Sequence, residues 1–528
     1  MRLNVYRYVE IVRNRLLFMD KRVKLMFKNM IFLYIRMFVI MCINLLAVRL
    51  LLQVLGETDY GIFNVVGGIV TMLSFLSSSM SSATMRFFSY NIGKGDNKNL
   101  RKLFSVSLMV YIGIIIISVL LAETGGLWFI YNKLLIPDSR FQAAFWVYQF
   151  SVVTFSLNMM SVPFMALIIS SEKMNFYVLL SIFDAVLKLV IIGIVHYMDG
   201  DKLILYVALF TSISIANIVA YLLYVKACYR QVEIIPRWDT VCFRELFSYC
   251  SWYMYGSVSQ LIKNQGINVL LNMFFNPVIN AARGIAYQIS SVMTTFVNSF
   301  YQDVRPQITK RYASGEIESM RSLVYQTTKM SYYLVLIISL PLLIILPEIL
   351  SLWLVQVPDH TVLFTRLVII ATIIETLELP LNTAICSNGN IKWFQLVTGT
   401  IVIMNLPISY LFLKLGYSPQ ITMIVAIAIA VLAQIARILF AKLVFGLNIK
   451  EYLILISKLG MTSLIAIIVP LLVRWKLQDI FRLDLLIGYI AISLLYILIV
   501  IYLVGISTKE RATLNYYVNS YIEKYRKK

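Results

Sequence analysis

The chain has 528 residues, 60% of them hydrophobic, with a mean hydropathy of +0.80 and a formal net charge of +21. This excess of apolar residues excludes an ordinary soluble globular domain. Apolar runs of about 20 residues recur, each long enough for a helix to cross a bilayer core, and they are continuous rather than alternating, which excludes a β-barrel. The sequence therefore predicts an all-α polytopic membrane protein.

We predict about 14 transmembrane helices from these runs. In chain order the predicted spans are 30–54, 60–86, 103–124, 143–169, 177–198, 202–226, 251–276, 281–303, 330–354, 362–386, 393–415, 419–444, 456–474 and 484–506. The first six form a predicted lobe over 30–226, and the next six form a second lobe over 251–444. A predicted cytoplasmic linker at 227–250 joins the lobes, and the last two helices occupy 445–506.

The positive charge has a one-sided distribution. Most Lys and Arg of the connecting segments lie on the side that holds both termini, so the positive-inside rule predicts cytoplasmic termini. Residues 1–29 are too charged for a signal-peptide core and predict an interfacial helix on anionic lipid, and 507–528 form a basic cytoplasmic tail. Membrane lipids therefore explain the net charge, and we predict no nucleic-acid partner.

Residues typical of cofactor chemistry are sparse. The five cysteines show no C-x-x-C spacing and the chain has two histidines, a composition that predicts no zinc or redox site. A phosphate-binding G-x-x-x-x-G-K-[ST] loop is absent from the sequence, which excludes an ATP-binding site of that type. We predict neither a metal nor another cofactor.

Two loops of the sequence resemble each other. KGDNKNLRKL at 94–103 and SGEIESMRSL at 314–323 share a spacing in which Gly95 and Gly315 stand 220 positions apart (315 − 95). Upstream, 67–89 aligns with the segment that begins at Arg283, and the alternative is a chance likeness of apolar sequence. An even number of helices between equivalent points predicts two six-helix bundles related by a pseudo-twofold axis along the membrane normal. The paired loops then mark a duplicated scaffold rather than an active site.

Polar residues follow one face of three predicted helices. At 100° per residue they form stripes, which comprise Arg283, Tyr287, Ser290, Thr294, Asn298, Tyr301 and Arg305; Ser257, Gln260, Asn264, Asn268 and Asn272; and, more weakly, Asn64, Thr71, Ser78, Ser82 and Ser89. Hydrogen-bonded helix packing is one interpretation. Stacked Asn, Gln and Arg side chains exceed what packing needs, so we favour a water-filled cavity.

Basic residues inside a membrane span are costly unless they face water, a partner or the interface. Seven of those in the predicted spans are considered as candidates: Arg36, Arg49, Lys188, Lys263, Arg283, Arg366 and Arg437. Those near span ends can snorkel, whereas Arg283 lies on its polar stripe and Lys263 lies mid-span. Arg283 also aligns with Gly67 in the repeat, so it breaks the symmetry.

These cations predict an anionic substrate. Arginine suits phosphate because its planar group donates two parallel hydrogen bonds, whereas lysine acts as a compact point charge. The predicted substrate-binding residues are Arg283, Lys263, Arg49, Asn264, Asn268, Asn298 and Arg36. Snorkelling is the alternative for Arg36 and Arg49.

Acidic residues within the predicted spans are candidates for ion coupling. Glu375 and Glu378 are i,i+3 neighbours just before Pro380, and either they couple transport to an ion or they neutralise a cation on another helix. Asp184 is a third candidate, although Lys188 one turn later makes a neutralising pair the simpler interpretation.

The stretch NQGINVLLNMFFNPVINAARGIAYQISSVMTTFVNSFYQDVRPQITKRYASGE at 264–316 resembles bacterial polysaccharide flippases of the multidrug/oligosaccharidyl-lipid/polysaccharide exporter superfamily. The resemblance implies movement of a polyprenyl-pyrophosphate-linked oligosaccharide, such as an O-antigen, capsule or exopolysaccharide unit, from the cytoplasmic to the periplasmic leaflet of the bacterial inner membrane. It implies alternating access through a central cavity lined largely by helices 1, 2, 7 and 8, and association with other polysaccharide-assembly membrane proteins. Family motifs do not fix the binding residues.

Three other functions stay open. A peptidoglycan-precursor flippase shares the predicted plan, and an ion-coupled multidrug exporter of the same superfamily would require acids in the first two helices, which contain none. The third is a membrane glycosyltransferase or polymerase, for which Asp199-Gly-Asp201 matches a metal-binding D-x-D pattern. That triplet lies in a short loop, where a polar turn is the simpler explanation.

Overall fold

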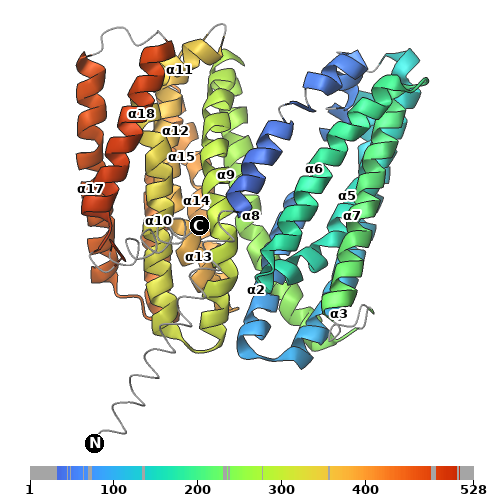
Figure 1. Ribbon diagram of the computed structural model, residues 1–528, viewed down its shortest axis with the longest axis horizontal. Coiled ribbons are helices and arrows are strands. Elements are labelled where there is room, and N and C mark those ends of the chain that lie inside the picture. The colour runs from blue at the N-terminus through green and yellow to red at the C-terminus, as the bar shows by residue number, and fades with distance from the viewer. Residues whose placement is uncertain are drawn as a thin grey trace, which may run out of the picture. The chain divides into compact units, whose positions relative to one another are not determined.

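The computed structural model describes residues 32–511 except 45, 48, 57, 64, 69, 71–73, 134–136, 230–234, 236–237, 276, 355–356, 477–482 and 508–509. Secondary structure within these residues is helical and includes no strand, which confirms the all-α prediction (Figure 1). The predicted interfacial helix at 1–29 and most of the predicted tail at 507–528 lie outside the described residues.

The helices follow one another with short connections. An N-terminal helical segment covers Phe32–Gly56. The labelled helices are α2 (Ser74–Lys94), α3 (Asn97–Leu121), the π-helix η1 (Ala122–Gly126), α4 (Leu127–Lys133), the 3-10 helix η2 (Asp138–Arg140), α5 (Phe141–Ser170), α6 (Met174–Tyr197), α7 (Lys202–Cys228), α8 (Thr240–Phe274), α9 (Pro277–Ala313), α10 (Ile317–Ile344), α11 (Leu346–Trp353), α12 (Thr361–Thr376), α13 (Glu378–Ser387), α14 (Lys392–Ile403), α15 (Asn405–Lys414), α16 (Ile421–Phe445), α17 (Ile449–Lys476), α18 (Leu483–Val500) and the π-helix η3 (Ile501–Gly505).

Among the described residues, 10 helical segments are long and apolar enough to cross a membrane, and each overlaps one predicted span. The four other predicted spans, 60–86, 251–276, 281–303 and 362–386, fall on α2, α8, α9 and the α12–α13 pair. The first three of these elements carry the polar stripes, and the fourth is interrupted. The spans that hydropathy alone marks least clearly are therefore those that contain the candidate site residues.

The predicted span at 362–386 consists of two helices. Pro380 has no backbone N–H, so the Thr376 carbonyl loses the partner that it would have in a continuous helix. The Leu377 carbonyl, at the break, accepts a hydrogen bond from the Gln434 amide at 3.4 Å, and the Tyr301 hydroxyl donates to the Leu379 carbonyl at 2.6 Å. Side chains of neighbouring helices thus bind backbone carbonyls around the break, as membrane proteins require of interrupted helices.

The chain divides into two compact units. Unit 1 comprises residues 1–257, 302–316 and 386–395, and unit 2 comprises 258–301, 317–385 and 396–528. The boundaries at Ser257 and Tyr301 fall inside α8 and α9, so both helices run from one unit into the other. Residues 240–250 of the predicted linker are helical, because Asp239 caps α8 by accepting a hydrogen bond from the Cys242 N–H at 3.0 Å.

Unit 1 is built around α5. This helix packs along α7 and against α2 and α3, and α6 packs against α7 (Figure 1). Aromatic rings join three of these helices, since Phe104 of α3 lies 5.9 Å from Phe88 of α2 and 5.4 Å from Phe164 of α5, measured between ring centroids. All three side chains are buried. Aromatic contacts of this kind contribute to stability beyond the area that they bury, so they help to hold these three helices together.

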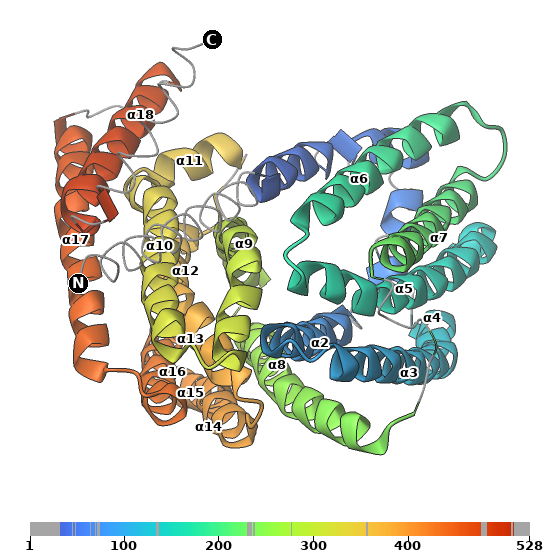
Figure 2. The same ribbon diagram turned by 60° about the horizontal axis from the view of Figure 1, so that its bottom comes forward.

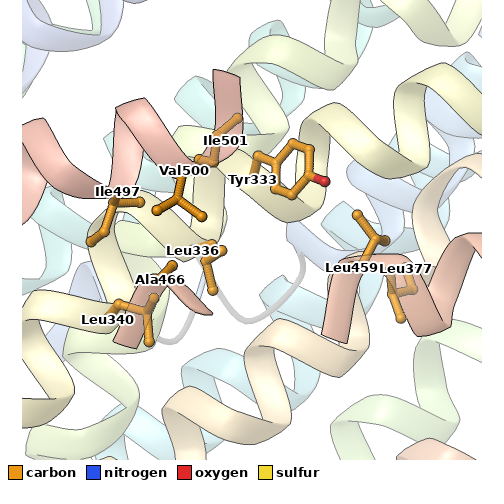
Figure 3. Packing of buried hydrophobic residues seen from close by; sticks show 9 residues of the cluster. All are labelled: Tyr333, Leu336, Leu340, Leu377, Leu459, Ala466, Ile497, Val500 and Ile501. Atoms are coloured by element: carbon orange, nitrogen blue, oxygen red, sulfur yellow. The ribbon is translucent and has the colours of Figure 1, made fainter. Parts of the chain in front are cut away.

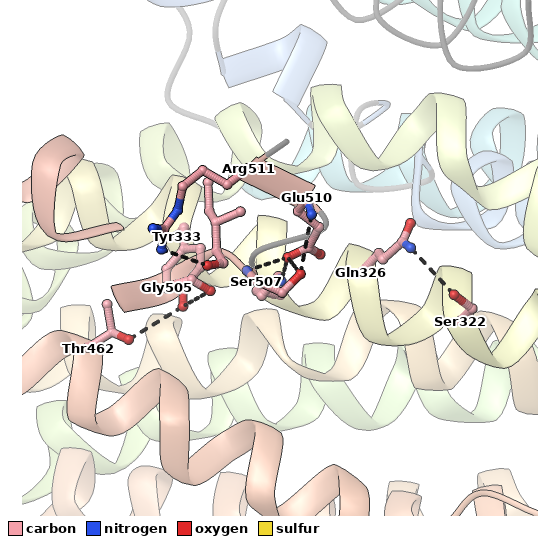
Figure 4. Close-up of polar contacts among 10 residues, drawn as sticks. Ser322, Gln326, Tyr333, Thr462, Gly505, Ser507, Glu510 and Arg511 are labelled. Atoms are coloured by element: carbon pink, nitrogen blue, oxygen red, sulfur yellow. Dashed lines mark hydrogen bonds and ion pairs between the residues drawn. The ribbon is translucent and has the colours of Figure 1, made fainter. Parts of the chain in front are cut away.

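Unit 2 contains the last two predicted spans. Its α12 packs against α10 and α16 (Figure 2), and α17 and α18 pack against α10 through a buried apolar cluster that includes Leu336, Leu340 and Ile497 (Figure 3). Beyond α18, the Tyr333 hydroxyl of α10 donates to the Gly505 carbonyl at 3.2 Å, and Glu510 accepts from the Ser507 N–H at 2.8 Å (Figure 4). The first contact attaches the end of η3 to α10, and the second is a local bond within the segment that follows.

The two similar loops adopt the same structure. Gly95 and Gly315 have φ angles of +72° and +78°, a conformation that glycine adopts without strain. In each copy, two backbone N–H groups donate hydrogen bonds to carbonyls of the preceding helix. The N–H groups of residues 95 and 96 donate to the carbonyls of residues 92 and 91, and those of residues 315 and 316 donate to the carbonyls of residues 312 and 311. This pattern is the Schellman motif that ends many helices. The same pattern also ends α15 at Gly416, so the duplicated scaffold stays a prediction from the sequence.

Candidate functional site

Arg283 of α9 is a buried cation whose contacts within the described residues are neutral. Its side chain is 5% exposed, one guanidinium nitrogen donates to the Asn268 amide oxygen of α8, and the guanidinium carbon lies 4.4 Å above the ring centroid of Tyr287. Across the described residues, neither a carboxylate within ion-pair distance nor an acceptor for the Arg283 Nε–H is present. An uncompensated charge inside a membrane domain costs free energy, which an anionic ligand would offset.

The α8–α9 hairpin holds this arrangement in place. Pro277 begins α9, where its fixed φ angle suits a first turn and its missing N–H breaks no helical bond. The Asn280 amide donates to the Asn268 carbonyl at 3.1 Å, and a buried cluster that includes Leu271 and Ala282 packs the two helices together. The small side chain of Ala282 leaves room for a close approach, so the hairpin fixes Arg283 against α8.

Two other cations that are buried in the described part of unit 2 have acidic partners. Lys263 of α8 is 6% exposed, and its ammonium lies 3.2 Å from a carboxylate oxygen of Glu375 at the end of α12. Arg437 of α16 lies 2.6 Å from Glu378, at the start of α13. The two acids thus stand on either side of the helix break, and each is paired with a cation from another helix. The predicted role of Glu375 and Glu378 in ion coupling, and of Lys263 in binding substrate, stays a prediction.

The polar stripe predicted on α9 has two different environments. Ser290 is buried and its hydroxyl lies 2.7 Å from that of Thr372, and Tyr301 is buried in its contact with α13. Asn298 is exposed. It continues an exposed polar row formed by Gln288, Ser291, Thr295 and Asn298. The predicted stripe thus packs partly against α12 and α13, and the exposed polar face lies farther round the helix. Its i, i+3, i+4 spacing is readable in the sequence, but periodicity did not indicate which of two adjacent faces packs.

The remaining predicted residues have varied surroundings. Asn264 of α8, in unit 2, is half-buried. In unit 1, Arg36 donates to the Ser181 hydroxyl at 2.7 Å and to the Tyr177 hydroxyl at 3.0 Å, both on α6. Arg49, also in unit 1, is exposed. Arg36 therefore binds side chains of another helix, a contact that the snorkelling alternative does not need.

Asp184 of α6, the third candidate for ion coupling, has two partners in unit 1. One carboxylate oxygen lies 2.8 Å from the Lys188 ammonium, and the other accepts a hydrogen bond from the Asn217 amide of α7 at 2.8 Å. The i,i+4 pair that the sequence suggested is therefore formed within α6, and a second helix, α7, takes part in it.

Segments from the second half of the sequence pack inside unit 1. The Arg86 guanidinium of α2 donates to the Ser387 carbonyl at 2.6 Å, and it lies 5.4 Å from the ring centroid of Tyr249. Lys310 of α9 lies 2.6 Å from the Glu172 carboxylate. A Cβ at Gly93 would lie 2.6 Å from the Lys310 carbonyl oxygen, so glycine permits α2 and α9 to meet here. These contacts join both sequence halves on the predicted cytoplasmic side.

The D-x-D triplet has a structural role at Asp201. Its carboxylate caps α7 by accepting from the Leu203 and Ile204 N–H groups, and it also lies 2.7 Å from Arg140. Burial alone would raise the pKa of Asp201, but the Arg140 guanidinium and the two N–H groups lower it below its ordinary value. Among the described residues, His, Cys, Asp and Glu form no group with metal-binding geometry. A helix cap and an ion pair thus account for Asp201.

Comparisons with known proteins place this arrangement in a family. The family model described as polysaccharide biosynthesis protein matches residues 26–310, more than half of the chain. None of the curated proteins matches the sequence significantly.

Solved structures of transporters share the fold. The MATE transporter ClbM in complex with Rb⁺ matches with a TM-score of 0.68 and 15% identity, over 81% of this chain and 96% of that one. The bent form of the Vibrio cholerae MATE transporter VcmN matches with a TM-score of 0.60 and 16% identity, over 80% of this chain and 96% of that one. A MOP superfamily transporter from Pyrococcus furiosus matches with a TM-score of 0.63 and 12% identity, over 79% of this chain and 95% of that one. At these identities the likeness shows the fold alone.

The family match and the apolar helices agree with the resemblance that the sequence suggested. This chain is a multi-pass membrane protein with the fold of MATE transporters, and it belongs to the polysaccharide biosynthesis protein family.

Proposed function

We propose that this transporter moves a polyprenyl-pyrophosphate-linked oligosaccharide from the cytoplasmic to the periplasmic leaflet of the bacterial inner membrane. The family match and the transporter fold support an exporter of this class. The observation that carries the proposal is the buried Arg283, whose contacts in the described part of the chain are neutral. A membrane-embedded cation that lacks a carboxylate partner is suited to an anionic ligand.

Pyrophosphate matches the chemistry at Arg283. A guanidinium donates two parallel hydrogen bonds to a phosphate group, which gives both affinity and orientation. Asn268 and Tyr287 hold the side chain without neutralising it, and the Nε–H is left to donate. Lys263 and Arg437, by contrast, already pair with acids. We therefore assign the pyrophosphate to Arg283.

The rest of the substrate requires hydroxyl-binding surface and access to lipid. The exposed polar row of α9 offers the amides and hydroxyls of Gln288, Ser291, Thr295 and Asn298 to sugar hydroxyls. Exposed apolar side chains such as Val292 and Val269 lie on the same two helices and suit a polyprenyl chain. Transport of such a substrate by alternating access requires the contacts between the two sequence halves in unit 1 to open in turn.

The proposal is tested by glycan export in cells. A strain without the protein is complemented with the wild type, with Arg283→Ala or with Arg283→Lys, and lipid-linked glycan is measured in each leaflet. We expect Arg283→Ala to leave the glycan in the cytoplasmic leaflet, and Arg283→Lys to restore part of the export, because lysine keeps the charge but loses the paired donors.

Arg366→Ala is the matched control. Arg366 is a second arginine on a membrane helix of unit 2, and its side chain donates to the Leu343 carbonyl at 3.3 Å. Export at the wild-type level is expected from this variant when its membrane abundance is equal. Normal export by Arg283→Ala would remove Arg283 from the site, and the sugar that accumulates would separate a polysaccharide unit from a peptidoglycan precursor.

A further inference from the structure

Unit 1 contains a polar cavity of about 190 Å³ among α5, α6 and α7. Its polar lining comprises Asn158 and Ser161 of α5, Asp184 and Lys188 of α6, and Ser214 and Asn217 of α7. All three helices are apolar membrane spans, and these residues lie along their central turns. Polar groups at that depth are costly unless they bond to each other, to water or to a ligand, so the cavity is a candidate binding site.

The charges at the cavity disfavour a cation as its occupant. The Asp184 carboxylate is engaged through both oxygens, by the Lys188 ammonium at 2.8 Å and by the Asn217 amide at 2.8 Å. Arg36 lies at its edge and donates to Ser181, which also lines the cavity, at 2.7 Å. Lys188, Arg36 and Asp184 sum to one positive charge. A metal cation would therefore have to displace the ammonium from the carboxylate and would meet a net positive surface.

Several groups of the cavity are left for a ligand. Asn158 is exposed and Ser214 is buried, and their side chains find no hydrogen-bond partner in the part of the chain that the structure describes. Two aromatic residues, Phe210 and Tyr221, also line the cavity, together with the aliphatic Leu180 and Ile213. Amide and hydroxyl groups beside aromatic faces suit a sugar, whose ring has polar hydroxyls and an apolar face of C–H groups.

We propose that this cavity binds one sugar ring of the transported glycan and prefers a ring that carries a carboxylate. The inference rests on the proposed function, because it takes the glycan to be the cargo. A volume of 190 Å³ equals about six water molecules at roughly 30 Å³ each, which is the scale of a single pyranose ring rather than of a disaccharide. The surplus positive charge favours a uronate, whose carboxylate would accept a charge-assisted hydrogen bond from Lys188.

The test is saturation-transfer NMR on the purified full-length protein in nanodiscs, with methyl glucuronide and methyl glucoside as probes. We expect both probes to bind the wild type, the glucuronide about tenfold more tightly, as one charge-assisted bond predicts. Asn158→Leu should abolish both signals, because leucine fills the entrance and removes an amide. Lys188→Met removes the charge-assisted donor and brings the sum of the remaining charges of Arg36 and Asp184 to zero, so this variant should bind both probes with equal affinity.

Three outcomes would overturn the proposal. They are the absence of saturation transfer to either probe, signals that persist unchanged in Asn158→Leu, and ²³Na relaxation that shows Na⁺ binding lost in Asp184→Asn without sugar binding. The last result would make the cavity a cation site.

Arg283→Ala separates this inference from the proposed function. The probes carry no pyrophosphate, so this variant should bind them as the wild type does. Sugar binding with normal export by Arg283→Ala would leave the cavity assigned and contradict the pyrophosphate site. If Arg283→Ala blocks export and the protein does not bind the sugar probes, the pyrophosphate site is supported and the sugar site in the cavity is contradicted.

Discussion

At the scale of single residues, the three buried cations of unit 2 differ in what surrounds them. Lys263 pairs with Glu375 and Arg437 with Glu378, whereas Arg283 contacts an amide and an aromatic ring. An ion pair between helices stabilises the fold, whereas a buried cation without a carboxylate partner is suited to bind an anionic ligand. This difference separates the residues that we assign to structure from the one that we assign to substrate.

The Lys263–Glu375 pair gives a stability prediction. Glu375→Gln leaves the ammonium of the buried Lys263 without its anion; because the Glu375 side chain is 40% exposed, we expect a loss below the roughly 3–5 kcal/mol of a fully buried pair. Lys263→Met leaves a carboxylate whose side chain is 40% exposed, so we expect a smaller loss. The double variant should recover most of the stability. A thiol-reactive dye can follow thermal unfolding of the purified variants, because Cys242, Cys250 and Cys386 are buried free thiols.

Transport distinguishes this structural role from ion coupling. We predict that the double variant Lys263→Met, Glu375→Gln moves glycan at the wild-type rate under an imposed ion gradient. A rate that no longer responds to the gradient, in protein that is stably inserted, would instead identify the pair as the coupling site.

Sequence reasoning found the residues of this network but not its pairs. Arg283 was marked by its place opposite Gly67 in the repeat, a difference that is visible without a structure. The partner of Lys263 is 112 positions away on another helix, and spacing along the chain carries no information about such a contact. The sequence suggested a cation partner for the two acids, without indicating which helix supplies it.

At the scale of elements, the polar helices were predicted in position but not in orientation. The stripe on α9 was read from its periodicity, yet Ser290 and Tyr301 pack against α12 and α13, and the exposed face includes Gln288 and Ser291. Periodicity locates polar faces on a helix, whereas the choice of the packed face depends on neighbours that are remote in the sequence. Similarly, Pro380 was recognised within a span, but the structure was needed to place the break at Leu377.

Contacts between the sequence halves in unit 1 give a prediction for α2 and α8. The Ser79 hydroxyl donates to the Ser257 hydroxyl at 2.9 Å, which is close enough for a disulfide once both residues are cysteine. In a variant without the five native cysteines, Ser79→Cys with Ser257→Cys should form a disulfide and stop transport, because alternating access requires α2 and α8 to separate. A reductant should restore the rate.

A second cysteine pair controls for the cross-link itself. The Thr154 and Thr211 hydroxyls are also 2.9 Å apart, but both lie in the first half of the sequence, on α5 and α7. Thr154→Cys with Thr211→Cys should therefore form a disulfide without stopping transport. Undiminished transport by the oxidised Ser79–Ser257 pair would contradict the requirement that these helices separate.

At the scale of the whole molecule, the apolar composition of the sequence predicted the membrane helices, whereas individual polar residues predicted little about how the helices are grouped. Long apolar runs predicted the membrane helices, because a bilayer of fixed thickness imposes a length that is readable in any window of sequence. The two compact units were harder to predict from the sequence. Residues 302–316 and 386–395 belong to unit 1 although they follow α8, since contacts such as that of Arg86 with Ser387 depend on distant segments meeting.

The central claim is that Arg283 binds the pyrophosphate of the transported lipid. It is tested most directly in proteoliposomes that contain a fluorescent polyprenyl-pyrophosphate oligosaccharide, with the outer leaflet bleached by an impermeant quencher. We predict that the wild type exposes inner-leaflet lipid to the quencher, that Arg283→Lys does so more slowly, and that Arg283→Ala is no faster than protein-free vesicles. Flipping by Arg283→Ala at the wild-type rate would contradict the claim.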